Sequence, residues 1–346
     1  MHICHVNLAR GFSGGERQTL QLIQQQIKEG YLLTVIAHPS SQLANEIKKL
    51  NCKLIVVSHF LLAHNKQATL KCDLIHVHEG KAIYWAWIQS LLYNIPYIVT
   101  RRIDNPLKNK WLANKAYRKA TVLIGLSTAI VNAIKRRHPL ADIYKIPSSP
   151  VVYPVNNQRV SEIKDEFKHK FIVIQAANLL KHKGHATTVK AARFLQTTHA
   201  DIQFVILGDG PEKQFLEEYC ADLNNVSLIG KINDIGNWFA ASNLLIHPSY
   251  SEGLGSVILE AIQAGLPVIG SRAGGIPDII DDGVSGLLVE PDNAQSLSDA
   301  IIAIYSDDLL RQRLCLGSKE KLNEFNIQYT ASLYQDIYQD VINANV

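Results

Sequence analysis

Short uninterrupted runs of β-branched and aliphatic residues recur along this chain, and each is followed by a stretch with helical periodicity. Strands without polar alternation are buried on both faces, as in a parallel sheet that helices cover on each side. The pattern therefore predicts a doubly wound α/β protein. The expected strands are residues 3–8, 33–37, 54–57, 74–77, 97–100 and 122–126, then 172–176, 204–207, 226–229, 244–247 and 268–270.

The alternation lapses once, near the middle of the chain. Prolines at 147, 150 and 154 are followed by a charged stretch up to Lys170. Since 346 residues are enough for two domains, we expect a first domain over residues 1–150, a linker over 151–169 and a second domain over 170–326. Residues 327–342 show one more amphipathic helical pattern, which makes 327–346 a terminal helix.

Features of membrane or exported proteins are weak in this sequence. The uncharged stretch 82–100 is interrupted by polar residues and by Pro96, so we interpret it as a buried helix followed by a buried strand. No basic segment followed by a long apolar run opens the chain. The five cysteines are scattered, which favours free thiols in a reducing compartment. We therefore expect a cytoplasmic protein.

Charge is divided unevenly along the chain. Residues 1–169 carry 23 Lys and Arg against 10 Asp and Glu, a net +13, whereas residues 170–346 carry 12 against 21, a net −9. A positive field on one half favours an anionic partner such as a phospholipid surface or a phosphorylated glycan, although a solvated surface explains it equally well. Basic residues are not interleaved with aromatic ones, so nucleic acid is not expected as a partner.

Residues 249–260 form the most informative junction between a strand and a helix. They follow a strand that ends at His247, contain Gly253 and Gly255, and open a helix near Gly255. Free N–H groups and the dipole at a helix start attract a phosphate, and the glycines allow a ligand to approach the backbone. Because Glu252 and Glu260 would repel that phosphate, we expect them to face sugar hydroxyls. A plain glycine turn is the alternative.

Two further junctions have similar chemistry. Lys183 stands next to Gly184 just beyond a strand end, where a lysine can neutralise a diphosphate, although a solvated loop lysine is the simpler interpretation. Residues 11–17 are glycine-rich at the start of the first helix but do not read G-x-G-x-x-G. No acidic residue stands where a ribose would be held, so a nicotinamide-dependent dehydrogenase is poorly supported.

Together these three junctions resemble the retaining glycosyltransferases of family 4, the group 1 glycosyl transferases, which have the GT-B fold. The most specific part is the E-x7-E element of Glu252 and Glu260, followed by Ala-Gly-Leu-Pro-Val-Ile-Gly at 264–270 and Gly-Gly-Ile-Pro-Asp at 274–278. The resemblance covers nearly the whole chain. It implies two Rossmann-like domains facing a cleft, with the terminal helix crossing back to pack on the first, acceptor-binding domain.

The resemblance also implies roles for individual residues. Glu260 would bind the nucleotide ribose, and Glu252 would lie beside the transferred sugar. The expected catalytic residues are Lys183, Glu252 and Arg102. The expected donor-binding residues are Gly14, Gly15, Asn178, Lys183, Gly230, Lys231, Ile232, Glu252, Gly253, Leu254, Gly255, Ser256 and Glu260.

Two positions depart from the family pattern. Asn178 stands where many members have arginine, so Lys183 lacks its usual cationic neighbour. Residues 101–104 read Arg-Arg-Ile-Asp where many members place a histidine near the sugar. Arg102 could replace the missing cation or bind an anionic acceptor, and the sequence leaves both open.

A metal site is not expected. The chain contains no Asp-x-Asp, and the resemblance implies that no metal is required; no other cofactor is expected, and the nucleotide-diphosphate sugar is a substrate. His76 and His78 follow one another on a strand, where we expect only one of them to face a given side, and no third ligand is apparent.

The function that follows is transfer of a sugar, with retained configuration, from a nucleotide-diphosphate sugar to an acceptor hydroxyl. The expected setting is the synthesis of lipopolysaccharide, glycolipid or another cell-envelope glycan, with a glycan or glycolipid acceptor. The basic first domain also allows peripheral contact with the inner membrane face, which the sequence does not decide. The alternatives are a nucleotide-sugar epimerase on the same scaffold and a sugar-binding protein without catalysis.

Overall fold

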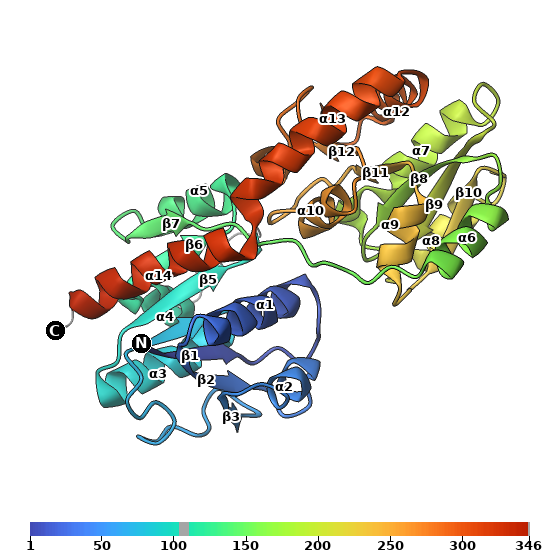
Figure 1. Ribbon diagram of the computed structural model, residues 1–346. Coiled ribbons are helices and arrows are strands. Elements are labelled where there is room, and N and C mark those ends of the chain that lie inside the picture. The colour runs from blue at the N-terminus through green and yellow to red at the C-terminus, as the bar shows by residue number, and fades with distance from the viewer. Residues whose placement is uncertain (104–110, 345–346) are drawn as a thin grey trace. The chain divides into compact units, whose positions relative to one another are not determined.

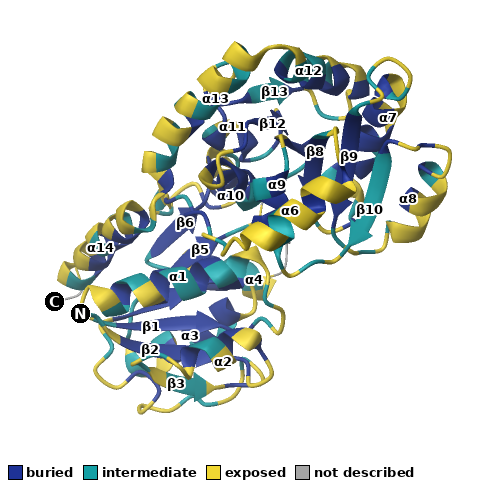
Figure 2. Ribbon diagram, turned by 45° about the vertical axis from the view of Figure 1, so that its right-hand side comes forward, coloured by how far each residue is buried: buried dark blue, intermediate teal, exposed yellow. Residues whose placement is uncertain are grey.

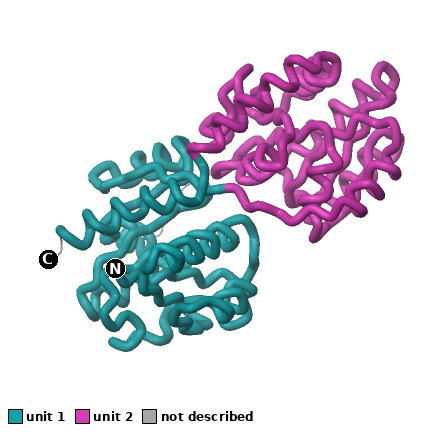
Figure 3. The backbone as a smooth tube through the Cα atoms, viewed as in Figure 1, with its two compact units in different colours: residues 1–149, 325–346 teal, residues 150–324 magenta. Residues whose placement is uncertain are grey.

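A computed structural model describes residues 1–103 and 111–344, and Asp104 of the arginine-containing segment lies outside these ranges. The chain forms two compact units (Figure 3). Unit 1 comprises residues 1–149 and 325–346, and unit 2 comprises residues 150–324. Each unit is built on its own parallel sheet, which confirms the predicted α/β class.

Unit 1 has a seven-stranded sheet in the order β3-β2-β1-β4-β5-β6-β7, and every pairing is parallel. Its strands are β1 (His2–Asn7), β2 (Leu32–Ala37), β3 (Lys53–Val56), β4 (Leu74–Val77), β5 (Tyr97–Arg101), β6 (Val122–Gly125) and β7 (Ile143–Lys145). Its helices are α1 (Gly14–Lys28), α2 (Gln42–Ile47), α3 (Ala82–Tyr93), α4 (Trp111–Lys119), α5 (Thr128–Arg137) and α14 (Ile327–Asn343).

Helix α14 belongs to unit 1 although it follows all of unit 2 in the sequence. It lies beside α1 and reaches β4 (Figure 1). Its buried residues, which include Tyr334, Ile337 and Tyr338, share one apolar core with Leu22, Ile23 and the sheet. The amphipathic pattern of 327–342 thus becomes a helix because one of its faces completes the core of a distant part of the chain.

Unit 2 has a six-stranded parallel sheet in the order β10-β9-β8-β11-β12-β13. Its strands are β8 (Phe171–Ala176), β9 (Ile202–Leu207), β10 (Val226–Gly230), β11 (Leu244–His247), β12 (Val268–Ser271) and β13 (Leu287–Val289). Its helices include α6 (Asn157–Glu166), α7 (His185–Leu195), α8 (Lys213–Tyr219), α9 (Ile235–Ala241), α10 (Ser256–Gln263), α11 (Ile276–Ile279), α12 (Ala294–Ser306) and α13 (Asp308–Lys321).

All eleven expected strands form, and two short ones were missed. Strands β7 and β13 each have three residues and lie at the end of their sheet. Tyr144 and Lys145 in β7 are exposed, so the run of buried aliphatic residues that identifies a central strand is absent there. The central strands are buried along most of their length, as Figure 2 shows in dark blue.

The segment predicted as a linker, residues 151–169, is partly helical. Helix α6 begins after Asn156, whose side chain accepts hydrogen bonds from the backbone N–H groups of Gln158 and Arg159. It packs against α9, and of its side chains only Ile163 is buried. A single buried position gives little apolar periodicity, which explains why a charged linker was expected.

No helix in the described part of the chain combines the length and the apolar character that a bilayer span would need. Helix α3 and strand β5 divide the uncharged stretch 82–100 between them, with Asn94 ending the helix in a left-handed conformation.

Candidate active site

Three loops of unit 2 lie at the same edge of its sheet. They follow β8, β11 and β12, and because the strands are parallel, their carboxyl ends meet at one edge. The loop after β8 contains a 3-10 turn at Lys181–Lys183, and the loop after β11 contains Glu252. This edge is where ligands bind in doubly wound sheets.

Lys183, Glu252 and His247 form a charged cluster at this edge. Lys183 Nζ lies 2.5 Å from Glu252 Oε2, and His247 Nε2 lies 2.8 Å from the same oxygen. The side chains of Lys183 and Glu252 are 16% and 15% exposed, and His247 is buried. Two predicted site residues 69 positions apart are therefore brought into direct contact.

The carboxyl group of Glu252 is held in its ionised form. Burial alone would raise its pKa, but the hydrogen bond and charge of His247 and the charge of Lys183 lower the pKa of Glu252 to about 2. At neutral pH this side chain can only accept hydrogen bonds. It is thus suited to hold hydroxyl groups of a ligand rather than to donate a proton.

His247 was not identified as a site residue from the sequence. It is the last residue of β11, five positions before Glu252, and its Nε2 also lies 3.1 Å from Ser249 Oγ. A histidine at the carboxyl end of a central strand was the available signal. The sequence could not show that the following loop turns back and brings the carboxylate of Glu252 within hydrogen-bonding distance of the His247 ring.

The loop after β8 is fixed by backbone contacts. Gln175 Nε2 donates to the carbonyl of Lys183, and the N–H of Tyr250 donates to the carbonyl of His182. Gly184 has φ +72°, and a Cβ there would overlap the carbonyl oxygen of Pro248. Only glycine lets the Lys183 turn pack this closely on the loop after β11.

The loop after β12 supports Glu252 from its other side. The N–H of Gly275 donates to the carbonyl of Glu252 at 2.9 Å, and a Cβ on Gly274, at φ +55°, would overlap that oxygen. The Gly-Gly pair at 274–275 therefore shapes the site without presenting a side chain to it.

Replacing Gly274 by alanine is expected to destabilise unit 2 more than the same change at Gly283. Both glycines have positive φ, which costs about 1 kcal/mol for alanine at either position. No atom lies within 4 Å of a Cβ on Gly283, whereas alanine at 274 must displace the backbone of Glu252, at about 1–3 kcal/mol more. Urea unfolding of the two variants measures the difference, and equal losses would contradict this account.

The start of α10 follows directly on this cluster. Gly255 caps the helix in a left-handed conformation with φ +96°, and Gly253 to Gly255 are buried. Ser256 is the first helical residue, and Glu260 lies one turn further on the same side of the helix and is buried. The first N–H groups of the helix thus lie near an ionised carboxylate and its lysine.

The remaining predicted donor residues of unit 2 lie at the end of β10 and at the start of the loop after β8. Gly230 ends β10, and its carbonyl accepts from the N–H of Gly208; Lys231 is exposed and Ile232 half-buried. Asn178 is exposed, and its carbonyl accepts from His185 Nε2 at 3.1 Å. Their predicted roles stay predictions.

Gly14, Gly15 and Arg102 belong to unit 1. Gly14 is the first residue of α1, whose start carries a capping box between Ser13 and Glu16. The side chain of Arg102 lies across Gly15, since a Cβ on that glycine would be 3.3 Å from Arg102 Cδ. The arginine that departs from the family pattern is therefore packed on Gly15, one of the expected donor-binding residues.

The expectation for His76 and His78 was wrong. Alternate residues of a strand share a face, and here both rings point to the same side and meet His5 of β1. One ring nitrogen from each of His5, His76 and His78, the histidine cluster, lies within 4.8 Å of the others, and all three residues are buried.

Hydrogen bonding disfavours a metal ion in the histidine cluster. His78 Nε2 lies 2.8 Å from His5 Nδ1, and His78 Nδ1 lies 3.3 Å from a terminal nitrogen of Arg102. An ion on Nε2 would move the ring proton to Nδ1, where it would oppose a guanidinium N–H. It would also place a metal cation close to the arginine.

Comparison with known families accounts for both units. The model of the family "Glycosyl transferases group 1" matches residues 156–320, and that of "Glycosyltransferase Family 4" matches residues 12–148. The chain belongs to glycosyltransferase family 4. Its two Rossmann-like units are those of the GT-B fold, and the predicted family and enzyme class are confirmed.

Individual relatives are distant but extend over both units. The chain is 25% identical to the UDP-Gal:alpha-D-GlcNAc-diphosphoundecaprenol alpha-1,3-galactosyltransferase of Escherichia coli, over 98% of this chain and 97% of that one. It is 27% identical to the N-acetyl-alpha-D-glucosaminyl L-malate synthase of Bacillus anthracis, covering 65% of this chain and 61% of that protein. Anabaena HepE, solved with UDP and glucose, superposes with a TM-score of 0.83 at 20% identity, over 98% of this chain and 100% of HepE.

Proposed function

We propose that this glycosyltransferase moves a sugar from a nucleotide-diphosphate sugar to an acceptor hydroxyl and retains the anomeric configuration. The observation that carries the proposal is the contact between Lys183 and Glu252 beside the start of α10. It places a cation, an ionised carboxylate and helix N–H groups together. All three groups suit a sugar diphosphate: the cation and the helix N–H groups bind its phosphates, and the carboxylate accepts hydrogen bonds from its hydroxyls.

Each group of the site has a part in this proposal. Glu252 accepts hydrogen bonds from the transferred sugar, and Glu260 accepts them from the ribose. The backbone from Gly253 to Ser256 donates to the β-phosphate, and residues 230–232 flank the base. Lys183 opposes the negative charge that grows on the departing diphosphate, and such preorganised charge is often the largest contribution to catalysis.

The chemistry we propose needs no covalent intermediate. The acceptor oxygen forms a bond to the anomeric carbon on the face from which the diphosphate leaves. The bond from that carbon to the phosphate oxygen breaks, and this oxygen takes the acceptor proton. Oε2 of Glu252 already accepts from both Lys183 and His247, so it is poorly suited to attack the sugar as a nucleophile.

The relatives support a uridine donor and a cell-envelope acceptor. HepE was solved with UDP and glucose, and the name of the Escherichia coli relative gives UDP-Gal and a diphosphoundecaprenol-linked sugar. Unit 1 carries 20 Lys and Arg against 9 Asp and Glu, a net +11. This charge suits an anionic acceptor such as a lipid diphosphate, and peripheral contact with an anionic membrane, because opposite charge raises its local concentration.

Calorimetric titration with UDP, GDP and ADP tests the donor site, with UDP expected to bind. Glu260→Ala should weaken UDP binding by about 10- to 100-fold, because a carboxylate that binds a hydroxyl contributes about 1.5–3 kcal/mol. Gln263→Ala is the matched control, since Gln263 is exposed on the same helix.

Equal UDP affinity in the Glu260→Ala and Gln263→Ala variants would remove Glu260 from the donor site. The products decide between the enzyme classes. A donor sugar converted without any acceptor would indicate an epimerase, and binding without any turnover a sugar-binding protein. NMR of the new glycosidic linkage shows whether the configuration is retained.

A further inference from the structure

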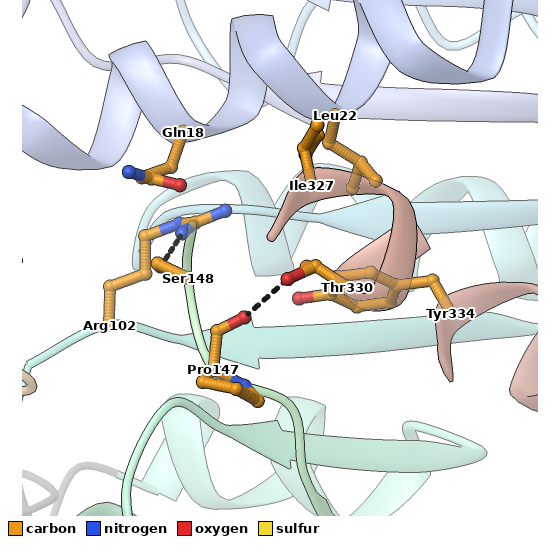
Figure 4. A pocket seen from close by; sticks show the side chains of 8 residues that line it. All are labelled: Gln18, Leu22, Arg102, Pro147, Ser148, Ile327, Thr330 and Tyr334. Atoms are coloured by element: carbon orange, nitrogen blue, oxygen red, sulfur yellow. Dashed lines mark hydrogen bonds between the residues drawn. The ribbon is translucent and has the colours of Figure 1, made fainter. Parts of the chain in front are cut away.

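Unit 1 contains a pocket that the proposed donor site does not use. It has enclosed room for about one water molecule, opens to solvent, and lies between α1, α14, the end of β5 and the segment after β7 (Figure 4). Its lining residues are Gln18, Leu22, Arg102, Pro147, Ser148, Ile327, Thr330 and Tyr334.

The guanidinium of Arg102 is the one charged group among these lining residues. Figure 4 shows it between Gln18 and Ser148. Its terminal nitrogens lie 3.3 Å from Ser148 Oγ and 3.3 Å from His78 Nδ1, and both are long hydrogen bonds. Its Nε atom is buried and has no hydrogen-bond partner in the part of the chain that the structure describes.

The histidine on which Arg102 lies is neutral. A guanidinium can only donate, so His78 Nδ1 accepts and the ring proton of His78 is on Nε2. That proton points to His5 Nδ1 at 2.8 Å, so the proton of His5 is on its own Nε2, which donates to Gln26 Oε1 at 2.7 Å. The direction of the whole chain of bonds is thus set by Arg102.

The third histidine is neutral because burial holds its pKa well below 6.5. His76 Nδ1 lies 2.7 Å from the hydroxyl of Tyr338, which accepts from the amide of Gln26, and His76 Nε2 lies 2.7 Å from Thr100 Oγ1. The histidine cluster, which Tyr338 of α14 contacts, therefore supplies one hydrogen-bond acceptor to Arg102 but no negative charge.

The positive charge of Arg102 is only partly compensated, through the electrostatic effect of the nearby Glu16 carboxylate. Arg102 makes no ion pair within the described residues, and Glu16 accepts the hydrogen bonds of the Ser13 cap. Burial lowers the pKa of Arg102, which shows that its surroundings disfavour the charge. Arg102 is partly buried, and a charge withdrawn from water is costly unless it is paired, so the protein gains when a ligand brings the counter-charge.

We propose that Arg102 is the centre of an oxyanion site in unit 1 that takes a phosphate or carboxylate group of a substrate. The fork of the guanidinium matches two oxygens of such a group, and Ser148 and Gln18 lie beside it. Only the assignment of this group to the sugar donor or to the acceptor rests on the proposed function. The site itself does not.

Titration with inorganic phosphate tests the site directly, with acetate as the carboxylate probe. In protein labelled with ¹⁵N in histidine, the His78 ring signals are expected to shift saturably, because the ligand draws Arg102 away from Nδ1. Arg102→Met should weaken the binding at least about tenfold, and Arg102→Lys, which keeps the charge without the fork, should weaken it less. Arg136→Met, an exposed arginine of the same unit, should leave it unchanged.

The results show whether the oxyanion site exists and, separately, which substrate supplies the oxyanion. If saturating UDP abolishes the phosphate shift of His78, the oxyanion belongs to the nucleotide; if the shift persists, it belongs to the acceptor, and either result supports the site. Phosphate binding that is equal in the wild type and both Arg102 variants, or that never saturates, overturns the proposal. UDP affinity is measured separately, so a failed donor site would not be mistaken for a failed oxyanion site.

Discussion

Replacing Lys183 by alanine is expected to lower the turnover of sugar transfer by about 100- to 1000-fold, the usual loss when one preorganised group that stabilises growing charge is removed. Lys183 has its Nζ 2.5 Å from Glu252 and is only 16% exposed, so bulk water replaces its charge poorly. The donor KM should change less than kcat, because the interaction strengthens as the diphosphate leaves. Steady-state kinetics with a saturating acceptor measures both constants.

Two further variants identify the cause of this loss. Lys181→Ala removes an exposed lysine from the same 3-10 turn and should keep full turnover. Lys183→Ala also leaves the charge of Glu252 without its lysine, which could repel the diphosphate by itself. The Lys183→Ala, Glu252→Gln double variant removes both charges and should remain slow. Recovery of turnover there would show that repulsion by Glu252, not loss of the cation, caused the defect.

The parts of the site that could be predicted are those carried by local sequence. A sequence window of about ten residues is enough to recognise a glycine before a helix, such as Gly255, which has a positive φ in the structure. The same holds for a lysine after a strand, such as Lys183. The central strands were equally clear because burial on both faces requires continuous aliphatic runs. Strand β7 and helix α6 were missed because their exposed positions dilute that signal, and strand β13 because it has only three residues.

The parts that could not be predicted are contacts between segments far apart in the chain. Lys183 meets Glu252 only because β8 and β11 are neighbours in the sheet. The local sequence of the two loops does not predict this strand order. The histidine cluster needs β1 beside β4, and its link to Tyr338 needs a helix more than 250 residues later. For His76 and His78 the error was simpler: their spacing of two already placed both on one face.

Unit 1 is expected to lose stability steeply as the pH falls from 6.5 towards 4. Burial lowers the pKa of His5 to about 4 and holds those of His76 and His78 well below 6.5. The unfolded chain takes up protons on these residues near pH 6.5 while the folded unit does not, so acid favours unfolding. By pH 5, His5 alone should lower the free energy of unfolding by about 2 kcal/mol, and the other two add to this loss.

Urea unfolding at a series of pH values measures this loss through tryptophan fluorescence, since Trp85, Trp87 and Trp111 lie in unit 1 and only Trp238 in unit 2. The slope of the unfolding free energy against pH, divided by 2.303RT, equals the protons taken up on unfolding. His5→Gln should reduce that number by about one, whereas His59→Gln, at an exposed position of the same unit, should not. Unchanged proton uptake in His5→Gln would mean that His5 is already charged in the folded protein. The direction of hydrogen bonding inferred from Arg102 would then be wrong, because a charged His5 has no acceptor to offer His78.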